Sequence, residues 1–489
     1  MVGPHPAGHL TRREALVRMG GLALAASAAT GAAKLAGALD LGSPGLPRPA
    51  VATDPQFVTR PDLRIPGLTV EATASGLSGG LLMFAPYNAP SPAQAGAVIV
   101  DEHGTPVWEQ PLAGLVTTDL RVQTYRGAPA LTWWEGLVRL GHGVGRYVIA
   151  DSAYRPLARV RAGNGRRGDL HEFLLTDRGT ALLTTYSVAH ADLCAVGGAR
   201  DGTIQDAIFQ EVDLASGRVL LEWHSLDHIP ISESYWPVGE NWDYVHLNSI
   251  AVDHDNNLLV SSRNTHTIYK IDRHTGQIIW RLGGKHTNFP IPPNARFAWQ
   301  HDARRQPNGT LTLFDNGNQI SRALILHLDE PHRTTQLQHA YQHPNRLFAN
   351  SQGNVQILPN HNILVGWGAQ PYISEFTPNG SLAYDAHFDP GYISYRAYRV
   401  PWAAAPRRAP DVAVRRSRGA TVVYVSWNGD SRVRTWTVLA GPSGSAIAAR
   451  GVRTGFETVM RVPARLAQLR VRGHDANGAV LVTSAAVTA

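Results

Sequence analysis

A pair of strands joined by a tight turn recurs along most of this sequence, and this repeat strongly constrains the fold. In one form of the repeat, an apolar strand leads through Asp and a Gly turn to a strand that ends on an aromatic residue. Its clear copies are VIVDEHGTPVWEQ (98–110), EVDLASGRVLLEW (211–223), YKIDRHTGQIIW (269–280) and SEFTPNGSLAYD (374–385). Weaker copies at 148–160 and 324–341 complete a series with a spacing of roughly 50 to 60 residues, near the period of propeller blades.

A second type of hairpin lies between these copies. It occurs in six segments, from LLMFAPY (81–87) to VQILPNHNILVGWG (355–368). These hairpins carry Gly or Asn where a tight turn needs positive φ. Two hairpins per unit give four strands per blade, so the sequence predicts an all-β fold built on a six-bladed β-propeller.

Changes in composition divide the chain after the propeller. We assign the propeller to residues 57–402, ending near SYRAYRVPW, and a Pro/Arg/Ala linker to 403–410. Residues 411–489 alternate strongly between apolar and polar side chains. This pattern predicts a small C-terminal β-sandwich that resembles a fibronectin type III domain, with Trp427 or Trp436 as its core aromatic residue.

The N-terminus has the form of a twin-arginine export signal. Arg12 and Arg13 precede a short run of Ala, Leu and Gly, and small residues follow around 28–32. We assign the signal to residues 1–33 and a linker to 34–56, and we expect an extracytoplasmic protein that meets the membrane only through this signal. The alternative is an uncleaved anchor, although the run is short for a transmembrane helix.

Charge and cysteine content narrow the possible partners. The formal net charge is +7, but the arginines are scattered or lie in the tail at 407–419, without a recognition-helix pattern or zinc-finger spacing. We therefore expect a solvated basic surface and no nucleic-acid partner. Cys194 is the single cysteine, which excludes an internal disulfide and a Cys-rich metal site. The sequence does not set the oligomeric state.

Three histidines stand in the same register relative to the turns of successive second-type hairpins. The pairs of histidine and turn residue are His171 and Gly179, His246 and Asn256, and His301 and Gly309. Their separations of eight, ten and eight residues are all even. Side chains alternate along a strand with a period of two, so the imidazoles share one face and one end of equivalent strands. Because the first strands of propeller blades line the central channel, the three histidines should converge there.

The residues around these histidines favour an anionic substrate. Arg263 and Asn248 can reach the same end of the strands, and a guanidinium provides a rigid fork of donors for sulfate or phosphate oxygens. No placed pair of carboxylates accompanies them, as glycoside hydrolysis would need. Gln352 and Gly353 stand where a fourth histidine could lie, so the site is expected to be three-sided. Three histidines alone could also hold zinc or copper.

Five motifs carry a resemblance to a known family. They are DLHEFLLTDRGTAL, HLNSIAVDHDNNLLVSSRNT, IDRHTGQIIWRLGG, QHDARRQPNGTLTLFDNG and SQGNVQILPNHNILVGWG. Together they resemble the arylsulfotransferase family, the exported PAPS-independent aryl-sulfate sulfotransferases, over residues 57–402. The resemblance implies an enzyme that takes a sulfuryl group from a phenolic sulfate ester and passes it through a histidine to a phenol. No cofactor and no metal ion are expected.

The resemblance also implies roles for individual residues. His301 of the QHD motif matches the transiently sulfated nucleophile, and His171 and His246 match the other active-site histidines. Asn248 and Arg263 match the residues that hold the sulfate oxygens. The chain departs from better-known members of the family in two ways, because its β-sandwich follows the propeller and it cannot form a disulfide.

Two other functions are compatible with the sequence. One is a metal-dependent propeller enzyme that uses His171, His246 and His301 as ligands. The other is a non-catalytic propeller that binds a partner or a glycan, with the C-terminal domain as a second module. Histidines in register in the channel speak against the binding module, which has no need of them.

Overall fold

The computed structural model describes residues 56–489, except 89–95, 113, 318, 390 and 442. The predicted export signal at 1–33 lies outside the described residues. No helix in the described part of the chain has the length and apolar character needed to cross a membrane.

The described strands up to residue 400 form six antiparallel sheets of four or five strands. The first sheet contains β25 (Tyr392–Val400), β2 (Leu81–Asn88), β3 (Gly96–Val100) and β4 (Pro106–Pro111). The second sheet contains β5 (Val116–Tyr125), β6 (Ala128–Arg139), β7 (His142–Ala150) and β8 (Pro156–Val160). The third contains β9 (Phe173–Leu175), β10 (Thr180–Ala191), β11 (Gly202–Asp213) and β12 (Val219–His224), and the fourth β13 (Leu247–Val252), β14 (Leu258–Ser262), β15 (Thr267–Ile271) and β16 (Ile278–Gly283). The fifth contains β17 (His301–Arg305), β18 (Leu311–Asp315), β19 (Arg322–Asp329) and β20 (Thr334–Tyr341), and the sixth β21 (Asn354–Ile357), β22 (Ile363–Gly366), β23 (Tyr372–Phe376), β24 (Leu382–Phe388) and β1 (Leu68–Thr73).

Helical structure is sparse. The described residues contain one α-helix, α2 (Ser225–His228), and three short 3-10 helices at Cys194–Val196, Ile231–Glu233 and Pro293–Ala295. The prediction of an all-β fold is therefore confirmed.

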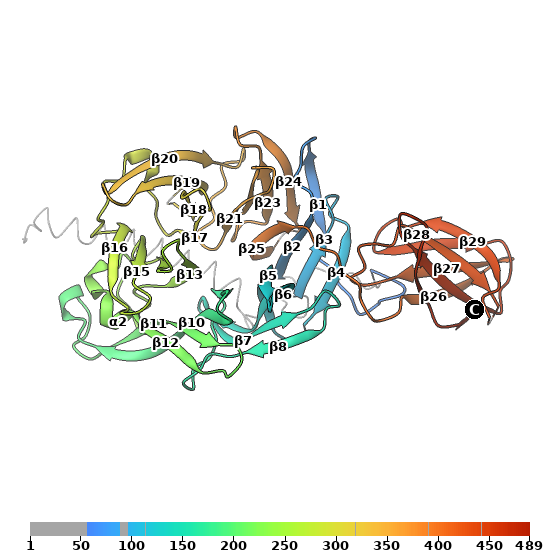
Figure 1. Ribbon diagram of the computed structural model, residues 1–489, viewed down its shortest axis with the longest axis horizontal. Helices are drawn as coiled ribbons and strands as arrows, with labels where there is room; N and C mark the ends of the chain where they lie inside the picture. Colours follow the sequence, from blue (N-terminus) through green and yellow to red (C-terminus); the bar gives the residue numbers. More distant parts are fainter. Residues whose placement is uncertain (1–55, 89–95, 113, 318, 390, 442) are drawn as a thin grey trace, which may run out of the picture.

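The two ends of this region are joined through shared sheets. The late strand β25 pairs with β2, and the early strand β1 pairs with β24. Figure 1 shows the sheets in a ring, with β5, β13, β17, β21 and β25 toward its middle. The sheets are therefore propeller-like blades, and these edge strands face the centre of the ring.

The predicted hairpin turns adopt the expected backbone conformation. The φ angles of Gly179, Asn256 and Gly309 are 73°, 67° and 86°. These left-handed values are the ones for which Gly and Asn are favoured. The turn positions from which the histidine register was counted are therefore correct.

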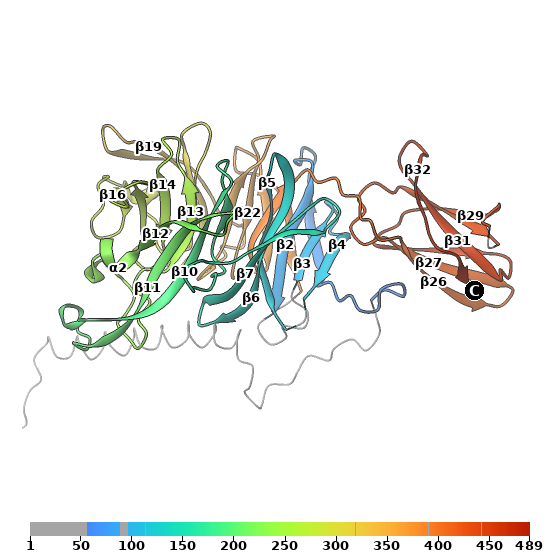
Figure 2. The same cartoon turned by 60° about the horizontal axis from the view of Figure 1, so that its bottom comes forward.

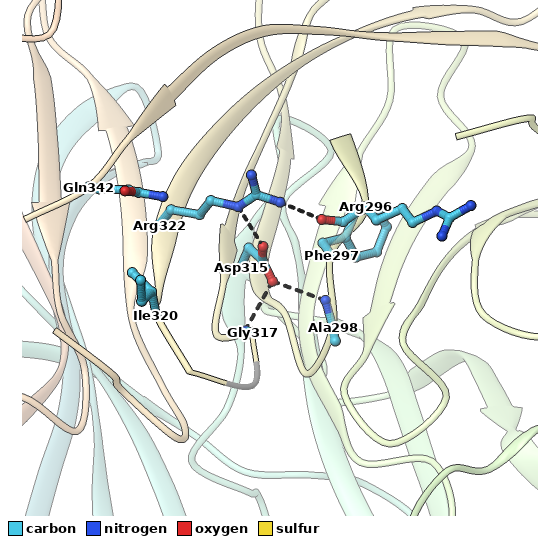
Figure 3. A pocket seen from close by; sticks show the side chains of 8 residues that line it. All are labelled: Arg296, Phe297, Ala298, Asp315, Gly317, Ile320, Arg322 and Gln342. Carbon is cyan, nitrogen blue, oxygen red and sulfur yellow. Dashed lines mark hydrogen bonds and ion pairs between the residues drawn. The ribbon is translucent and has the colours of Figure 1, made fainter. Parts of the chain in front are cut away.

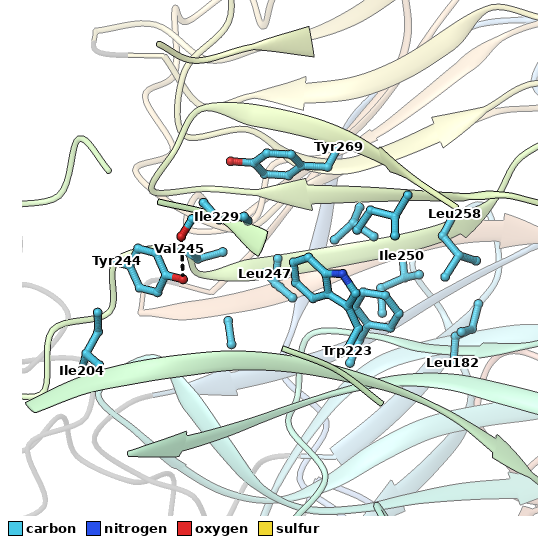
Figure 4. Close-up of a cluster of buried hydrophobic side chains, with 14 of the residues drawn as sticks. Leu182, Ile204, Trp223, Ile229, Tyr244, Val245, Leu247, Ile250, Leu258 and Tyr269 are labelled. Atoms are coloured by element: carbon cyan, nitrogen blue, oxygen red, sulfur yellow. Dashed lines mark hydrogen bonds between the residues drawn. The ribbon is translucent and has the colours of Figure 1, made fainter. Parts of the chain in front are cut away.

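Apolar side chains between adjacent sheets fix the positions of the central strands. In one such cluster, Leu182 and Trp223 of the third sheet pack with Leu258 and Tyr269 of the fourth (Figure 4). Val245 and Leu247 also belong to this cluster and are fully buried. Because both neighbours of His246 are anchored in the core, the backbone at His246 is held at the head of β13.

The C-terminal residues form two further sheets. One contains β26 (Asp411–Ser417), β27 (Ala420–Ser426) and β30 (Glu457–Val462), and the other β29 (Ala446–Val452), β28 (Thr435–Ala440), β31 (Gln468–His474), β32 (Val480–Thr483) and β33 (Val487–Thr488). Trp427 and Trp436 both lie in the apolar cluster between these strands. Figure 2 shows this part of the chain beside β4, and the Glu109 backbone of β4 exchanges hydrogen bonds with the Asn428 side chain. The C-terminal sheets thus contact the outer edge of the ring.

Candidate active site

The three histidines that the sequence singled out lie at the heads of first strands. His171 stands two residues before β9, His246 directly precedes β13, and His301 is the first residue of β17. The ring centroids of His171 and His246 are 4.7 Å apart. Tyr395 on β25 links His171 to His301, because its ring centroid lies 5.6 Å from that of His171 and 6.5 Å from that of His301. The structure therefore brings these side chains into one buried aromatic cluster.

Hydrogen bonds determine which nitrogen of His301 carries the lone pair. The Asn316 side chain donates from Nδ2 to the carbonyls of Ala349 and Gln352, so its Oδ1 faces Nδ1 of His301 at 2.7 Å. Nδ1 must therefore be the protonated nitrogen. The other nitrogen, Nε2, accepts from the backbone N–H of Gln352 at 3.2 Å. His301 is thus held in the tautomer whose Nε2 can act as a nucleophile.

The environment also keeps His301 neutral. Burial lowers the pKa of its imidazole well below the ordinary value, and the nearby charge of Arg263 lowers this pKa further. A neutral imidazole is the reactive form in nucleophilic catalysis, and the lone pair on Nε2 can attack once it gives up the hydrogen bond from Gln352.

Arg263 follows β14 directly and packs against two indole rings that contact each other edge to face. Its guanidinium carbon is 5.3 Å from the Trp236 ring centroid and 4.8 Å from that of Trp299. Nη1 donates to Oδ1 of Asn264, and Nη2 to the carbonyl of Asn350. Burial lowers the pKa of Arg263 to about 10, which leaves the guanidinium charged at neutral pH. Arg263 is therefore a rigid cation that can hold an anionic group.

Asn248 connects two of the central strands. Its Nδ2 donates to the carbonyl of Gln300 at 2.8 Å, and its own carbonyl accepts from the Tyr395 hydroxyl at 3.1 Å. The amide oxygen Oδ1 is buried and has no partner among the described residues. One hydrogen of Nδ2 is therefore engaged within the protein, which leaves the amide with one further hydrogen and an unpartnered acceptor.

Each of the other two histidines is paired with a carboxylate that the sequence analysis did not identify. Nδ1 of His171 lies 2.5 Å from Oδ2 of Asp169, and Nδ1 of His246 lies 2.5 Å from Oδ2 of Asp243. Burial opposes ionisation of Asp169, but the attraction of His171 prevails and lowers the carboxyl pKa to about 2. A carboxylate on Nδ1 fixes the ring and leaves Nε2 for proton transfer.

A fourth histidine completes the cluster, which corrects the expectation of a three-sided site. His142 is the first residue of β7, and its ring centroid lies 5.3 Å from that of His246 and 6.3 Å from that of His171. Gln352 stands two residues before β21 of the sixth sheet, as His171 stands two residues before β9. His142 instead comes from the tip of a hairpin between the second and third strands of the second sheet, outside the register that was counted.

Within the described residues, one group of side chains is close enough to surround a metal ion. The possible ligand atoms of His142, Asp243 and His246 lie within 4.8 Å of one another. However, Oδ2 of Asp243 is 2.5 Å from Nδ1 of His246, whereas two ligands of a zinc ion at about 2.0–2.1 Å stand about 3 Å or more apart. The set fits a hydrogen-bonded chain better than a coordination sphere, and it contains neither His171 nor His301.

The loop before His301 is fixed by a carboxylate at the end of β18. Oδ1 of Asp315 accepts from the backbone N–H of Ala298, and Oδ2 pairs with Arg322, which also donates to the carbonyl of Arg296 (Figure 3). A cavity of about 340 Å³ lies beside these residues, but no histidine of the cluster lines it. This region therefore supports the approach to Trp299 and His301 and is separate from the site itself.

A buried ion network lies against the same strands. Its members are Asp119, Arg121, Glu172, Asp302, Arg304 and Arg396. Glu172 and Asp302 directly follow His171 and His301 in the sequence, and both pair with Arg304. Arg396 donates to the carbonyl of Asn248 at 2.9 Å. The network therefore fixes the backbone beneath the predicted site residues.

A histidine whose charged form is disfavoured, near a partly buried arginine, can bind and receive an anionic group. Comparison with known proteins agrees with this class. The chain belongs to the arylsulfotransferase family, because the family model described as Arylsulfotransferase (ASST) matches residues 121–389. Membership supports an aryl sulfotransferase function in general, with small-molecule aryl sulfates and phenols as substrates. No protein of curated function matches the chain.

Solved structures resemble the chain only distantly. A Bacteroides caccae protein of unknown function aligns with 12% identity over 68% of this chain and 98% of its own, at a TM-score of 0.39. A Lactobacillus plantarum protein aligns with 12% identity over 84% of this chain and 97% of its own, at a TM-score of 0.38. A streptogramin B lyase aligns with 11% identity over 73% of this chain and 94% of its own, at a TM-score of 0.32. These scores are too low to assign a function.

Proposed function

We propose that this chain is an exported aryl-sulfate sulfotransferase that moves a sulfuryl group from a phenolic sulfate ester to a phenol through a sulfohistidine on His301. The nucleotide donor PAPS takes no part in this reaction. The observation that carries the proposal is the environment of His301, where Asn316 accepts from Nδ1 while burial and the charge of Arg263 lower the pKa of the imidazole. Family membership supports the general activity.

In the first half of the proposed reaction, Arg263 and Asn248 hold the sulfate oxygens of the donor. The lone pair on Nε2 of His301 forms a bond to sulfur, and the bond between sulfur and the aryl oxygen breaks. A histidine of the cluster protonates the aryl oxygen, and the phenol leaves. In the second half, a phenol acceptor loses its proton to the cluster and attacks the sulfur, which restores the neutral His301.

This division of labour suits sulfuryl transfer. Like phosphoryl transfer, it depends mainly on positioning and on fixed charges around the equatorial oxygens. Arg263 provides such a charge without reorganisation, because its guanidinium is already held by two carbonyl-type acceptors and two indole rings. The carboxylates of Asp169 and Asp243 keep Nε2 of His171 and His246 available for the sulfate or for protons.

The remaining assignments of the domains are part of the same proposal. Residues 1–33 are a twin-arginine signal, 34–56 a linker, 57–402 a six-bladed propeller and 411–489 a fibronectin type III-like domain after a linker at 403–410. The separate sheets on either side of this second linker support that division. A folded protein without disulfides suits the twin-arginine pathway.

Turnover of a chromogenic aryl sulfate by the purified full-length protein, with and without an added phenol, tests the activity. We expect the added phenol to accelerate release of the chromophore, with ping-pong kinetics. Treatment with a chelator should leave this activity intact. Activity that disappears on chelation and returns with zinc would favour the metal-dependent alternative, and absence of any turnover would contradict the proposal.

A further inference from the structure

Asp243 holds two histidines that come from different sheets. Its Oδ2 lies 2.5 Å from Nδ1 of His246 and 3.2 Å from Nε2 of His142. Nδ1 of His142 is buried and has no hydrogen-bond partner among the described residues. One nitrogen of His142 is therefore engaged by the carboxylate, and the other remains for a ligand.

The hairpin tip that carries His142 is also tied to the second carboxylate of the site. Oδ1 of Asp169 accepts from the backbone N–H of Gly143 at 2.6 Å, while Oδ2 of the same group pairs with His171. Gly143 is required for this approach, because a Cβ there would lie 2.6 Å from the Leu170 nitrogen and 2.7 Å from the Trp134 ring. Two separate carboxylates thus join the β6–β7 hairpin to two histidines of the cluster.

The ring of His142 lies among titratable groups of the site. The groups that face it are Asp243, Asp169, His171, His246 and Tyr186. Tyr186 remains protonated, because burial raises its pKa well above the ordinary value, and its hydroxyl donates to the carbonyl of Leu247. The charges of Asp243 and Asp169 both favour a proton on His142.

The two histidines on Asp243 differ in their affinity for protons. Burial disfavours the charged form of His142, but the attraction of Asp243 prevails and raises the pKa of His142. Burial dominates at His246 and lowers its pKa to about 4. Neighbouring groups whose pKa values are pushed apart commonly act as the acid and the base of an active site. His142 therefore binds a second proton more strongly than His246 and is the one of the two that can carry it.

We propose that His142 is a fourth catalytic histidine, which gives a proton to the aryl oxygen of the sulfate donor and later takes one from the phenol acceptor. This inference rests on the proposed sulfotransferase function and names the residue that carries the proton. The geometry behind it is the shared carboxylate of Asp243, the free Nδ1 and the position of the ring beside His246 and His171.

The proposed step balances in both halves. As the bond between sulfur and the aryl oxygen breaks, that oxygen takes the proton from Nδ1 of His142, whose Nε2–H stays on Asp243. The phenol leaves, and His142 is neutral while His301 carries the sulfuryl group. The acceptor phenol then returns a proton to Nδ1 as its oxygen bonds to sulfur, so no proton is gained or lost in the full cycle.

Two donors with different leaving groups test this role in the full-length enzyme. Phenyl sulfate releases a phenolate whose conjugate acid has a pKa of about 10, so its departure needs protonation. 4-Nitrophenyl sulfate releases a much weaker base, which can leave without it. In His142→Gln, which keeps a group able to donate to Asp243, we expect kcat/KM to fall about 10²- to 10⁴-fold with phenyl sulfate and less than about tenfold with 4-nitrophenyl sulfate.

A second variant and a matched control separate catalysis from structure. Added imidazole should restore part of the phenyl sulfate activity of His142→Ala. His332→Ala, which removes an exposed histidine that also pairs with an aspartate, should alter neither rate. Equal losses with both donors in His142→Gln, without rescue of His142→Ala, would overturn the role of His142 while leaving the sulfotransferase proposal intact. A wild-type protein that turns over neither donor would overturn both.

Discussion

Oδ1 of Asn316 lies 2.7 Å from Nδ1 of His301 and thereby leaves Nε2 as the nitrogen that can attack. The direction of the Asn316 amide is itself set by two donated hydrogen bonds, to the carbonyls of Ala349 and Gln352. Asn316, which directly follows β18, therefore selects the tautomer of His301, the proposed nucleophile.

Replacing Asn316 with Leu should reduce donor cleavage without removing the nucleophile. The carbonyl of Trp299 also lies 3.1 Å from Nδ1 and can still accept its proton. The loss in kcat/KM should therefore be about 10- to 100-fold, short of the ~10⁴-fold effect of a fully reversed tautomer. Steady-state kinetics with an aryl sulfate measure this effect. Asn477→Leu, at an exposed C-terminal turn, is the control, and an Asn316→Leu enzyme as fast as this control would contradict the assignment.

Loss of Arg263 or Asn248 should slow sulfuryl transfer by about 10²- to 10³-fold in kcat, the scale for a single electrostatic donor. Arg263→Lys should not restore the rate, because an ammonium cannot replace a planar group that packs against two indoles and donates to two acceptors. Arg178→Ala, on an exposed turn, serves as the matched control. Full activity in Arg263→Lys would show that the guanidinium fork has no special role.

The pH dependence of donor cleavage should reflect the depressed pKa of His301. Burial and Arg263 hold this pKa well below 6.5, so the reactive neutral form persists as the pH falls through that value. With an activated donor that needs no general acid, kcat/KM should stay nearly level from neutral pH down to about pH 5, where an unperturbed histidine would already be mostly protonated. A half-maximal rate near the ordinary pKa of histidine would contradict the assigned environment.

Export should depend on the paired arginines. Replacing Arg12 and Arg13 with Lys should retain the folded protein inside the cell, because the twin-arginine pathway reads this pair. Cell fractionation followed by immunoblotting measures the distribution. Secretion of the double variant at the wild-type level would refute the signal assignment and would leave the catalytic proposals unaffected.

The sequence allowed the histidines at the heads of the first strands to be found, because their spacing from turn residues is even and the turns at Gly179, Asn256 and Gly309 have the expected φ. The same periodicity predicted the hairpins and the all-β class. Strict alternation does not run through to the histidines, because the pairing of β13 with β14 shifts between Leu247 and Ser249 and that of β17 with β18 shifts between His301 and Arg304. The spacing therefore located the ends of the strands, and the local bulges help to set where the side chains lie.

The partners of those histidines could not be found in this way. Asp169 and Asp243 stand in the loops before β9 and β13, where no strand period applies, although each lies only two or three residues before its histidine. His142 reaches the cluster from another sheet, and only the flanking glycines, Gly141 and Gly143, hint at a close approach. Contacts of this kind depend on how sheets pack against each other, which the local pattern does not contain.

The central claim is that His301 carries the sulfuryl group between the two half-reactions. Replacing His301 should abolish both donor cleavage and transfer, whereas loss of His171 or His246 should impair proton transfer and sulfate binding but leave residual activity. These variants affect different steps of the reaction. Detection of the sulfated intermediate is therefore the direct test of whether His301 carries the sulfuryl group.

Mass spectrometry of protein quenched after mixing with an aryl sulfate in the absence of acceptor tests this claim most directly. We predict a sulfo adduct on the peptide that contains His301, discharged by a phenol and absent from His301→Asn. An adduct on another residue, or normal turnover by His301→Asn, would contradict the mechanism.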